Sequence, residues 1–314
     1  MTGQIKMVKK EKHSLMQNIV KNKYLFVLVL PALLSVFIFS YLPMIGVVLA
    51  FKDFDIVKGI WGSDWVGMDN FREVVTNPEL LKSIANTLIY GMVCVFGTFP
   101  FPIILALMFN EVKNTAFKKI TQTVSYMPHF ISWIAVIGMF YSFFATEGSF
   151  NNIMAIIKGG NYEATNILMD SRFFLPIIFL AGLWKDVGWS SVIFLAAITG
   201  VDNSIIEAGK IDGCGRLKQI WYIILPSIRA TIVVVLIMSL GGLFNTNFEL
   251  VYGFQNVFTQ EQTDVIGTVI YRQGIQNGKY SLATAFGISQ GIVTMAITLL
   301  ANQLSKKLFD TSIW

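Results

Sequence analysis

The sequence predicts an all-α polytopic membrane protein that crosses the bilayer six times. Of its 314 residues, 54% are hydrophobic and only 14% are charged, and 26 of them are Phe. A water-soluble domain of this length could not hide so much apolar surface without exposing large patches. Basic residues recur at every second segment between the apolar runs, as the positive-inside rule describes. The net charge of +5 therefore reflects membrane orientation, and we expect no nucleic-acid partner.

The first apolar run, about 24–51, follows a basic segment, 1–23, that we expect to lie in the cytoplasm. This run is far longer than the roughly 7–15 apolar residues of a signal peptide, and no small-residue cleavage site follows it. It should therefore remain as a membrane anchor. With the external loop after it, the anchor forms the predicted region 24–79.

A helix needs about 20 mainly apolar residues to cross the hydrocarbon core. Six segments meet this requirement: 24–50, 83–109, 120–145, 174–199, 227–250 and 281–304. The first three contain prolines at Pro31, Pro43, Pro100, Pro102 and Pro128. In a membrane, such breaks persist only where neighbouring helices or a wet cavity satisfy the freed carbonyls. The prolines are thus consistent with ordinary kinks or with a bundle around an internal path.

The orientation follows from the distribution of Lys and Arg. If the N-terminus is inside, the inner segments contain fifteen of the 24 basic residues and the outer segments contain eight, with Lys185 left inside a span. This split predicts that both termini and the segment 201–226 are cytoplasmic. It also makes 306–314 a cytoplasmic tail.

The segment between spans four and five has the pattern of a helical hairpin. Three candidate N-caps, Asp202, Asn203 and Ser204, open it, and Ser204 with Glu207 has the spacing of a capping box. Gly213 is expected to end the first helix in a left-handed conformation. A second helix from about residue 215 would place four apolar residues on one side: Leu217, Ile220, Trp221 and Ile224.

Pro226 then suits the first turn of span five. A passive connection needs only a few residues. A structured hairpin of some 25 residues therefore predicts that another protein docks there.

The spacing within this hairpin resembles the EAA motif of ABC importer permeases. The matching residues are Glu207-Ala208-Gly209, then Gly213, Ile223 and Leu225-Pro226. The third position is usually Ala, and Gly209 weakens the helix by about 1 kcal/mol. Six further stretches resemble the LplB/YtcP-type polysaccharide and oligosaccharide permeases: "YLPMIGVVLAFKDF" (41–54), "SDWVGMDNF" (63–71), "PIILALMFNEVKNTAFKKITQTVSYMPHFISW" (102–133), "WKDVGWSSVIFLAAITGVD" (184–202), "YSLATAFGISQ" (280–290) and "SIW" (312–314).

The resemblance implies a type I ABC importer fold in a bacterial cell membrane, with 80–305 as its transmembrane core domain and 201–226 as the coupling hairpin within it. Its expected partners are a second homologous permease, a cytoplasmic ABC ATPase dimer, an extracytoplasmic solute-binding protein, an oligosaccharide and the lipid bilayer. This chain would bind no cofactor and would not be an enzyme, because ATP and Mg²⁺ belong to the ATPase. The residues expected to couple to the ATPase are Glu207, Ala208, Gly209, Lys210, Asp212 and Gly213.

Simpler roles remain open for several of these residues. Glu207 could serve only the helix cap, Gly213 only the backbone turn, and Lys210 could face water or anionic headgroups.

Three ionisable residues inside predicted spans are unusual: Lys185, Asp186 and Glu249. Such groups often mark a pathway. Alternatively, the first two lie in a moist outer vestibule and Glu249 closes the outer end of span five. Asn245 and Glu249, four residues apart, can share a helix face. We predict that Asn245 and Glu249, with Trp184 and Trp189, contact the sugar. An interfacial position for the tryptophans is the alternative.

No other pattern indicates catalysis or a metal site. His13 and His129 have no nearby Cys, Asp or Glu at metal-ligand spacing. The run "GIQNGKY" (274–280) has three residues between its glycines where a phosphate loop needs four. The alternative function is an ion-coupled secondary sugar carrier, which often shows inverted repeats. None is evident in this sequence.

Overall fold

The computed structural model describes residues 22–159, 162–244 and 246–309. Most of the predicted N-terminal segment and of the C-terminal tail therefore lie outside the described residues. Four helices are long and apolar enough to cross a membrane: Lys23–Phe51, Pro78–Glu111, Ser171–Thr199 and Tyr280–Lys307. Two bent pairs also qualify: Thr115–Phe130 with Trp133–Lys158, and Arg216–Ser227 with Arg229–Gly241. Counting each pair as one span gives the predicted six.

The elements follow one another in this order, with η marking 3-10 or π turns: α2 (Lys23–Val36), η1 (Phe37–Tyr41), η2 (Leu42–Phe51), β1 (Lys52–Asp53), α3 (Gly59–Gly62), β2 (Asp64–Trp65), α4 (Asp69–Thr76), α5 (Pro78–Met92), η3 (Val93–Gly97), α6 (Pro100–Glu111), α7 (Thr115–Tyr126), η4 (Met127–Phe130), α8 (Trp133–Phe144), α9 (Ser149–Lys158), η5 (Ile167–Met169), α10 (Ser171–Thr199), α11 (Asn203–Ile211), α12 (Arg216–Gln219), η6 (Ile220–Ile224), α13 (Leu225–Ser227), α14 (Arg229–Gly241), α15 (Phe248–Phe254), α16 (Gln260–Thr263), α17 (Ile266–Ile270), η7 (Tyr271–Gln276) and α18 (Tyr280–Phe309).

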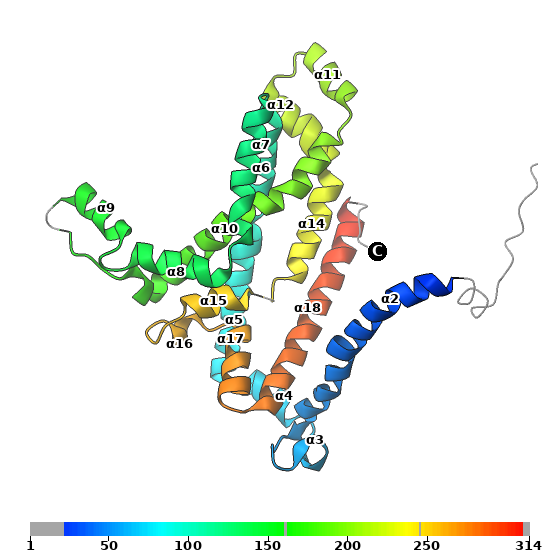
Figure 1. Ribbon diagram of the computed structural model, residues 1–314, viewed down its shortest axis with the longest axis vertical. Coiled ribbons are helices and arrows are strands. Elements are labelled where there is room, and N and C mark those ends of the chain that lie inside the picture. Colours follow the sequence, from blue (N-terminus) through cyan, green and yellow to red (C-terminus); the bar gives the residue numbers. More distant parts are fainter. Residues whose placement is uncertain (1–21, 160–161, 245, 310–314) are drawn as a thin grey trace, which may run out of the picture.

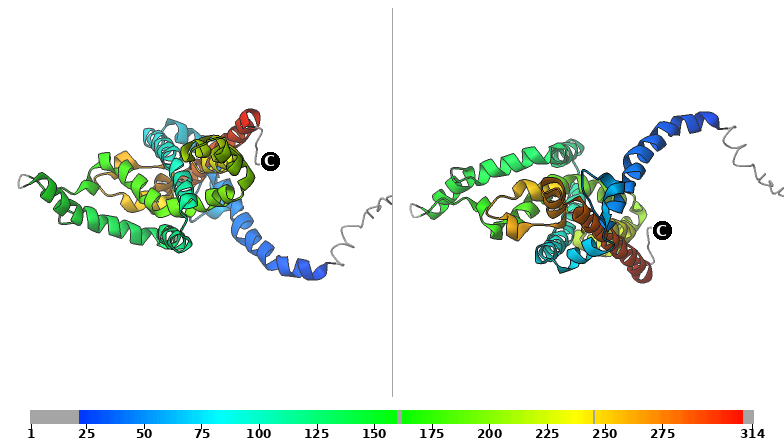
Figure 2. Two further views of the ribbon diagram at one scale, coloured as in Figure 1. Left: turned by 90° about the horizontal axis from the view of Figure 1, so that it is seen from above. Right: turned by 90° about the horizontal axis from the view of Figure 1, so that it is seen from below.

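The helices form an elongated bundle with α11 at one end and α3 at the other (Figure 1). Within it, α10 packs along α6, α14 packs against α18, and η2 also contacts α18. The first helix stands apart: α2 projects away from the bundle in both end views (Figure 2), and none of its residues is buried. A helix that is apolar all round and unburied suits a lipid or protein environment.

The third span is broken rather than kinked. Its two parts, Thr115–Phe130 and Trp133–Lys158, meet at 98°. Pro128 lies in the short η4 turn before the break, and Ser132 starts α8 by accepting a hydrogen bond from the backbone N–H of Ala135. The Nζ of Lys185 on α10 donates to the carbonyl of His129. A polar side chain from a neighbouring helix thus satisfies a carbonyl that the break frees.

The fifth span is not the continuous helix predicted over 227–250, and that prediction is wrong. The chain bends by 65° between Ser227 and Arg229, and α14 already ends at Gly241. Gly241 and Gly242 are weak helix formers. The freed carbonyl of Phe244 accepts a hydrogen bond of 2.7 Å from the Nε2 of Gln290 on α18. A tertiary contact therefore stabilises the interruption between α14 and α15.

A small antiparallel hairpin, β1–β2, lies at the α3 end of the bundle and pairs Lys52 with Trp65. The Lys52 side chain is buried, and its Nζ donates to the carbonyls of Ile60 (2.9 Å), Trp61 (3.2 Å) and Ser63 (3.1 Å). Three charge-assisted hydrogen bonds compensate for the burial of this ammonium group. They hold the turn between the two strands closed.

Candidate functional site

The predicted hairpin is present and protrudes from one end of the molecule (Figure 1). Its first helix, α11, begins after Asp202, whose carboxylate accepts a 2.9 Å hydrogen bond from the backbone N–H of Ser204. The predicted capping box of Ser204 and Glu207 is therefore wrong, because Asp202 takes the cap and Ser204 lies inside the helix. The hydrogen bonds from the Ser204 backbone and then from its side chain lower the pKa of Asp202.

This lowered pKa makes the cap sensitive to acid. A carboxyl group with a depressed pKa stabilises the fold above its unfolded pKa, about 3.9, and loses that contribution as the pH falls through the lower folded pKa. We expect D202A to reduce the amide protection of residues 203–211 several-fold at neutral pH, measured by hydrogen exchange. D202N should retain this amide protection, since Asn caps a helix as well as Asp does. Because Asn does not titrate, the protection in D202N should no longer fall at acidic pH. Equal protection in D202A and wild type would contradict this role.

The end of α11 confirms the predicted role of Gly213 in the turn. Its φ of 76° is left-handed. The N–H of Cys214 donates to the Gly209 carbonyl (2.8 Å) and the N–H of Gly213 to that of Lys210 (3.1 Å). These two hydrogen bonds form a Schellman motif. The Nε2 of Gln219 then donates to the Cys214 carbonyl (2.7 Å), which fixes the second arm to the turn.

The two arms of the hairpin touch through Gly209. A Cβ at this position would lie 2.5 Å from the Cδ1 of Ile223. Gly209 therefore faces the second arm and is half-buried, whereas the other predicted coupling residues are exposed: Glu207, Ala208, Lys210, Asp212 and Gly213. The small residue at the third motif position thus lets the first arm lie close against the second.

The second arm does not have the single apolar face that we expected. Ile224 is buried with Ile228, Ala106 and Phe194 in a cluster that joins the hairpin to α6 and α10. Leu217 and Trp221, however, are 74% and 67% exposed, so they lie on a different side of the arm from the buried Ile224. On the first arm, Ile211 is 87% exposed. The tip of the hairpin therefore presents apolar side chains to whatever surrounds it.

A second feature is a cavity of about 220 Å³ inside the bundle. It lies between α5–α6, α10 and the interruption after α14. Its polar lining comprises the side chains of Tyr90, Thr98, Asp186, Ser190, Thr246 and Asn247. Such a cavity, mostly apolar with a few polar groups, has the character of a small-molecule site.

Asp186 is tied to the break in the third span. One of its carboxylate oxygens lies 2.8 Å from the Nδ1 of His129, whose ring stacks on Trp189 with centroids 4.8 Å apart. The adjacent Lys185 is only 6% exposed, with its Nζ on the His129 carbonyl and 5.2 Å from the centre of the Trp133 ring. The expectation that Lys185 lies in a moist vestibule is therefore wrong. Its charge is compensated by a carbonyl and an aromatic face.

The structure does not bring the four predicted sugar contacts together in this cavity. Trp184 and Trp189 lie on α10, but neither lines the cavity, and Glu249 is exposed in the first turn of α15. Asn245 lies outside the described residues. Their contact with sugar stays a prediction. Sequence reasoning missed His129, which we treated as isolated, because Asp186 is 57 positions away and no local pattern joins the two.

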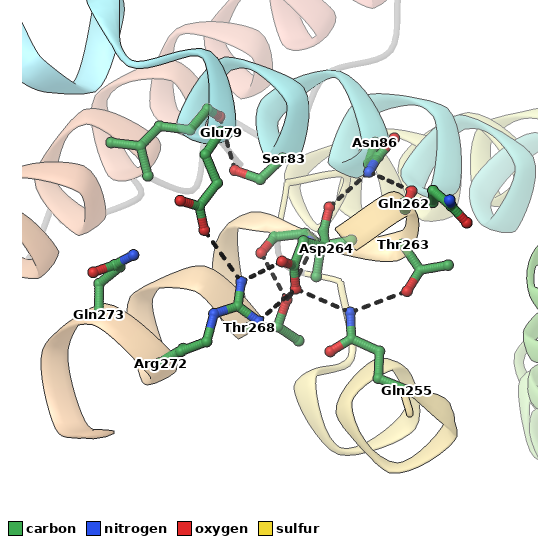
Figure 3. A network of polar contacts seen from close by, with 12 residues as sticks. Glu79, Ser83, Asn86, Gln255, Gln262, Thr263, Asp264, Thr268, Arg272 and Gln273 are labelled. Carbon is green, nitrogen blue, oxygen red and sulfur yellow. Dashed lines mark hydrogen bonds and ion pairs between the residues drawn. The ribbon is translucent and has the colours of Figure 1, made fainter. Parts of the chain in front are cut away.

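A polar network at the α3 end of the bundle was also unforeseen. Figure 3 shows Arg272 between Asp264 and Glu79, with which it forms ion pairs. The Asp264 carboxylate also accepts a hydrogen bond from the Thr268 hydroxyl (3.1 Å). Asn86 of α5 donates to the carbonyls of Gln262 and Asp264, each at 2.9 Å. The network joins α5 to the segment between α15 and η7. It therefore stabilises this irregular segment between the fifth and sixth spans.

Among the described residues, no group of three or more His, Cys, Asp or Glu side chains could hold a metal ion.

Comparisons with known proteins agree with this architecture. A sequence profile described as "Binding-protein-dependent transport system inner membrane component" matches residues 98–310. The chain is 38% identical to the polygalacturonan/rhamnogalacturonan transport system permease protein YteP of Bacillus subtilis (strain 168), over 98% of this chain and 95% of YteP. It is 39% identical to Protein LplB of the same organism, over 92% and 90% of the two chains.

Two solved structures extend the likeness to three dimensions. The first is a bacterial ABC transporter involved in the import of the acidic polysaccharide alginate, with a TM-score of 0.86, 34% identity and coverage of 94% of this chain and 99% of that chain. The second is an alginate ABC transporter in complex with an alginate pentasaccharide-bound periplasmic protein, with the same score and identity and coverage of 96% and 100%. The predicted importer fold is therefore confirmed, and the protein belongs to the binding-protein-dependent transport system inner membrane components, the permease family of ABC importers.

Proposed function

We propose that this chain is the permease subunit of an ATP-driven importer for oligosaccharides or polysaccharide fragments delivered by an extracytoplasmic binding protein. The substrate class rests on the relatives, since YteP is a polygalacturonan/rhamnogalacturonan permease and the similar structures import alginate. The binding protein rests on the complex that one of those structures contains. The cavity beside Asp186 would form part of the transport path.

The protruding hairpin is the observation that carries the coupling part of this proposal. Ile211 is 87% exposed at its tip, beside the exposed Ala208 and Lys210. Apolar groups at a protruding helix end are typical of a protein contact. We assign this contact to one subunit of a separate ATPase dimer, which would bind ATP and Mg²⁺. A second, homologous permease would supply the other hairpin.

Reconstitution tests the proposal directly. Proteoliposomes containing this chain, the second permease, the ATPase and the binding protein should accumulate a labelled oligosaccharide only with ATP on the ATPase side. Ionophores that collapse ion gradients should leave the uptake intact, and omission of the second permease should abolish it. ATP-independent uptake driven by an ion gradient would instead identify an ion-coupled carrier.

The orientation is tested with the native cysteines. We expect Cys214, next to the hairpin turn, to react with a membrane-impermeant maleimide only when the reagent reaches the cytoplasmic side. The C94S variant provides a background in which Cys214 is the single thiol, since the chain has two cysteines. A cysteine introduced at Ser312 would report on the C-terminus in the same way. Labelling of either position from outside the cell would reverse the proposed topology.

A further inference from the structure

The loop between β1 and β2 carries apolar side chains that no other part of the described chain covers. Ile56, Val57 and Trp61 are 71%, 95% and 78% exposed. They lie close together in the sequence, at the end of the bundle opposite α11 (Figure 1). Large apolar side chains grouped on a protruding segment are typical of a surface that binds a partner. We name these three residues the β-hairpin tip.

The backbone that presents the β-hairpin tip is fixed by hydrogen bonds. Three of them come from the Nζ of Lys52, as described above. The Ser63 hydroxyl donates to the Gly59 carbonyl (2.6 Å) and accepts from the N–H of Asp55 (3.0 Å). The Asp55 carboxylate accepts in turn from the N–H of Val57 (2.7 Å). A surface that is ordered before it binds loses less conformational entropy on binding, so the tip is preorganised for a contact.

The loop is also attached to the spans. The N–H of Phe54 donates to the hydroxyl of Ser281 (3.0 Å), in the first turn of α18. The side chain of Asn70 on α4 donates to the carbonyls of Ala50 (2.9 Å) and Lys52 (3.0 Å). The β-hairpin tip therefore stands on a fixed base, and a molecule bound to it would take a defined position on the permease.

The charges around the β-hairpin tip favour one kind of partner. Asp53, Asp55 and Asp64 are exposed beside it, whereas Lys58 is the one basic residue of the segment 53–64. This lysine is already paired with Asp64 (2.7 Å). Segments that bind a lipid surface are typically rich in Lys and Arg, which anionic headgroups attract. The acidic surroundings therefore favour a protein partner with basic residues around an apolar pocket.

The position of the β-hairpin tip indicates which protein this is. In the proposed topology, the loop follows the first span and lies outside the cell, at the opposite end from the hairpin that contacts the ATPase. A protein that delivers substrate from outside meets this end, whereas a second permease packs beside the spans. We infer that the β-hairpin tip is a docking site for the extracytoplasmic binding protein, an inference that rests on the proposed function.

The test measures the affinity of the binding protein for the complete transporter in nanodiscs. The binding protein is saturated with the oligosaccharide used in the uptake assay. W61A should raise the Kd at least tenfold, because exposed aromatic anchors dominate many protein contacts. V57D should raise it as much, because the contact would bury an unpaired carboxylate. The loop should persist in both variants, since its hydrogen bonds use the backbone of Trp61 and Val57.

Two further variants separate charge and position. D55N retains an oxygen for the N–H of Val57 and removes one charge. Its Kd should therefore rise only several-fold and should depend less on salt. I156D is the matched control, because Ile156 is also an exposed apolar residue (83%) and lies on α9, outside the cell in the proposed topology. I156D should bind the binding protein as wild type does.

All variants should keep the wild-type elution profile and the ATPase activity measured without the binding protein. A wild-type Kd in both W61A and V57D, together with ATP-driven uptake, would overturn the inference and leave the importer function standing. A wild-type transporter that does not bind the binding protein at all would contradict the proposed function itself.

A fluorophore at the β-hairpin tip distinguishes the other occupants. V57C in a C94S/C214S background is labelled with an environment-sensitive dye in the same nanodiscs. The emission should shift to the blue when the binding protein is added. An emission that is equally blue before the addition would show that lipid or the second permease covers the tip, and would overturn the inference.

Discussion

Replacement of Gly188 by alanine should prevent the protein from reaching its folded state in useful amounts. A Cβ on Gly188 would lie 1.9 Å from the carbonyl oxygen of Ser125 and 2.4 Å from its carbonyl carbon. Both are backbone atoms of α7, so no side chain can rotate away. The two helices would have to separate, and α10 would lose its packing against α7.

The expected cost exceeds that of ordinary overpacking, which is about 1–3 kcal/mol. The separation would also pull Lys185 and Asp186 away from His129, because these side chains lie within one turn of Gly188 on α10. The result should be aggregation on size-exclusion chromatography in detergent and a strongly lowered melting temperature. Ser125→Ala would not relieve the clash, since it leaves the carbonyl in place.

Gly138 provides the matched control. It lies in α8, and a Cβ there would meet no atom within 4 Å. G138A should therefore behave as wild type, and its greater helix propensity favours α8 slightly. A G188A protein with the elution profile, melting temperature and uptake of G138A would show that α10 and α7 do not approach as closely as described.

The second large effect concerns the hairpin and should appear in coupling rather than in folding. G213V places a β-branched residue at a φ of 76°, a conformation that is a genuine outlier for such side chains and costs about 1–2 kcal/mol. The Schellman hydrogen bonds at Gly209 and Lys210 should then be lost. G209E acts differently, because its side chain would be forced against Ile223 and would push the two arms apart.

Both variants should insert normally, since the apolar spans and flanking charges are unchanged. Transport should nevertheless be abolished, with loss of ATPase co-purification and of substrate-stimulated ATP hydrolysis. G215A is the control, because Gly215 has a φ of −66° and a Cβ there would meet no atom within 4 Å. Wild-type ATPase binding and transport in both G213V and G209E would reduce the hairpin to a connector and remove the main support for coupling.

The sequence by itself determined those features that depend on local interactions. Six spans follow from the lengths of the apolar runs, because each run must cover the hydrocarbon core. The left-handed turn at Gly213 follows from the conformational freedom of glycine. The helix before this turn follows from the capping residues at its start. These predictions needed no knowledge of what lies beside each residue in space.

Tertiary structure decided where the spans break and what the buried polar groups do. The interruption after Gly241 is stabilised by Gln290, 46 positions from the carbonyl that it satisfies. The break near Pro128 is stabilised by Lys185, 56 positions from His129, and Asn86 reaches Asp264 across 178 positions. Inside a membrane, a freed backbone carbonyl must find a donor within the protein. That donor comes from whichever helix packs alongside, and only the packing of the whole bundle decides which helix that is.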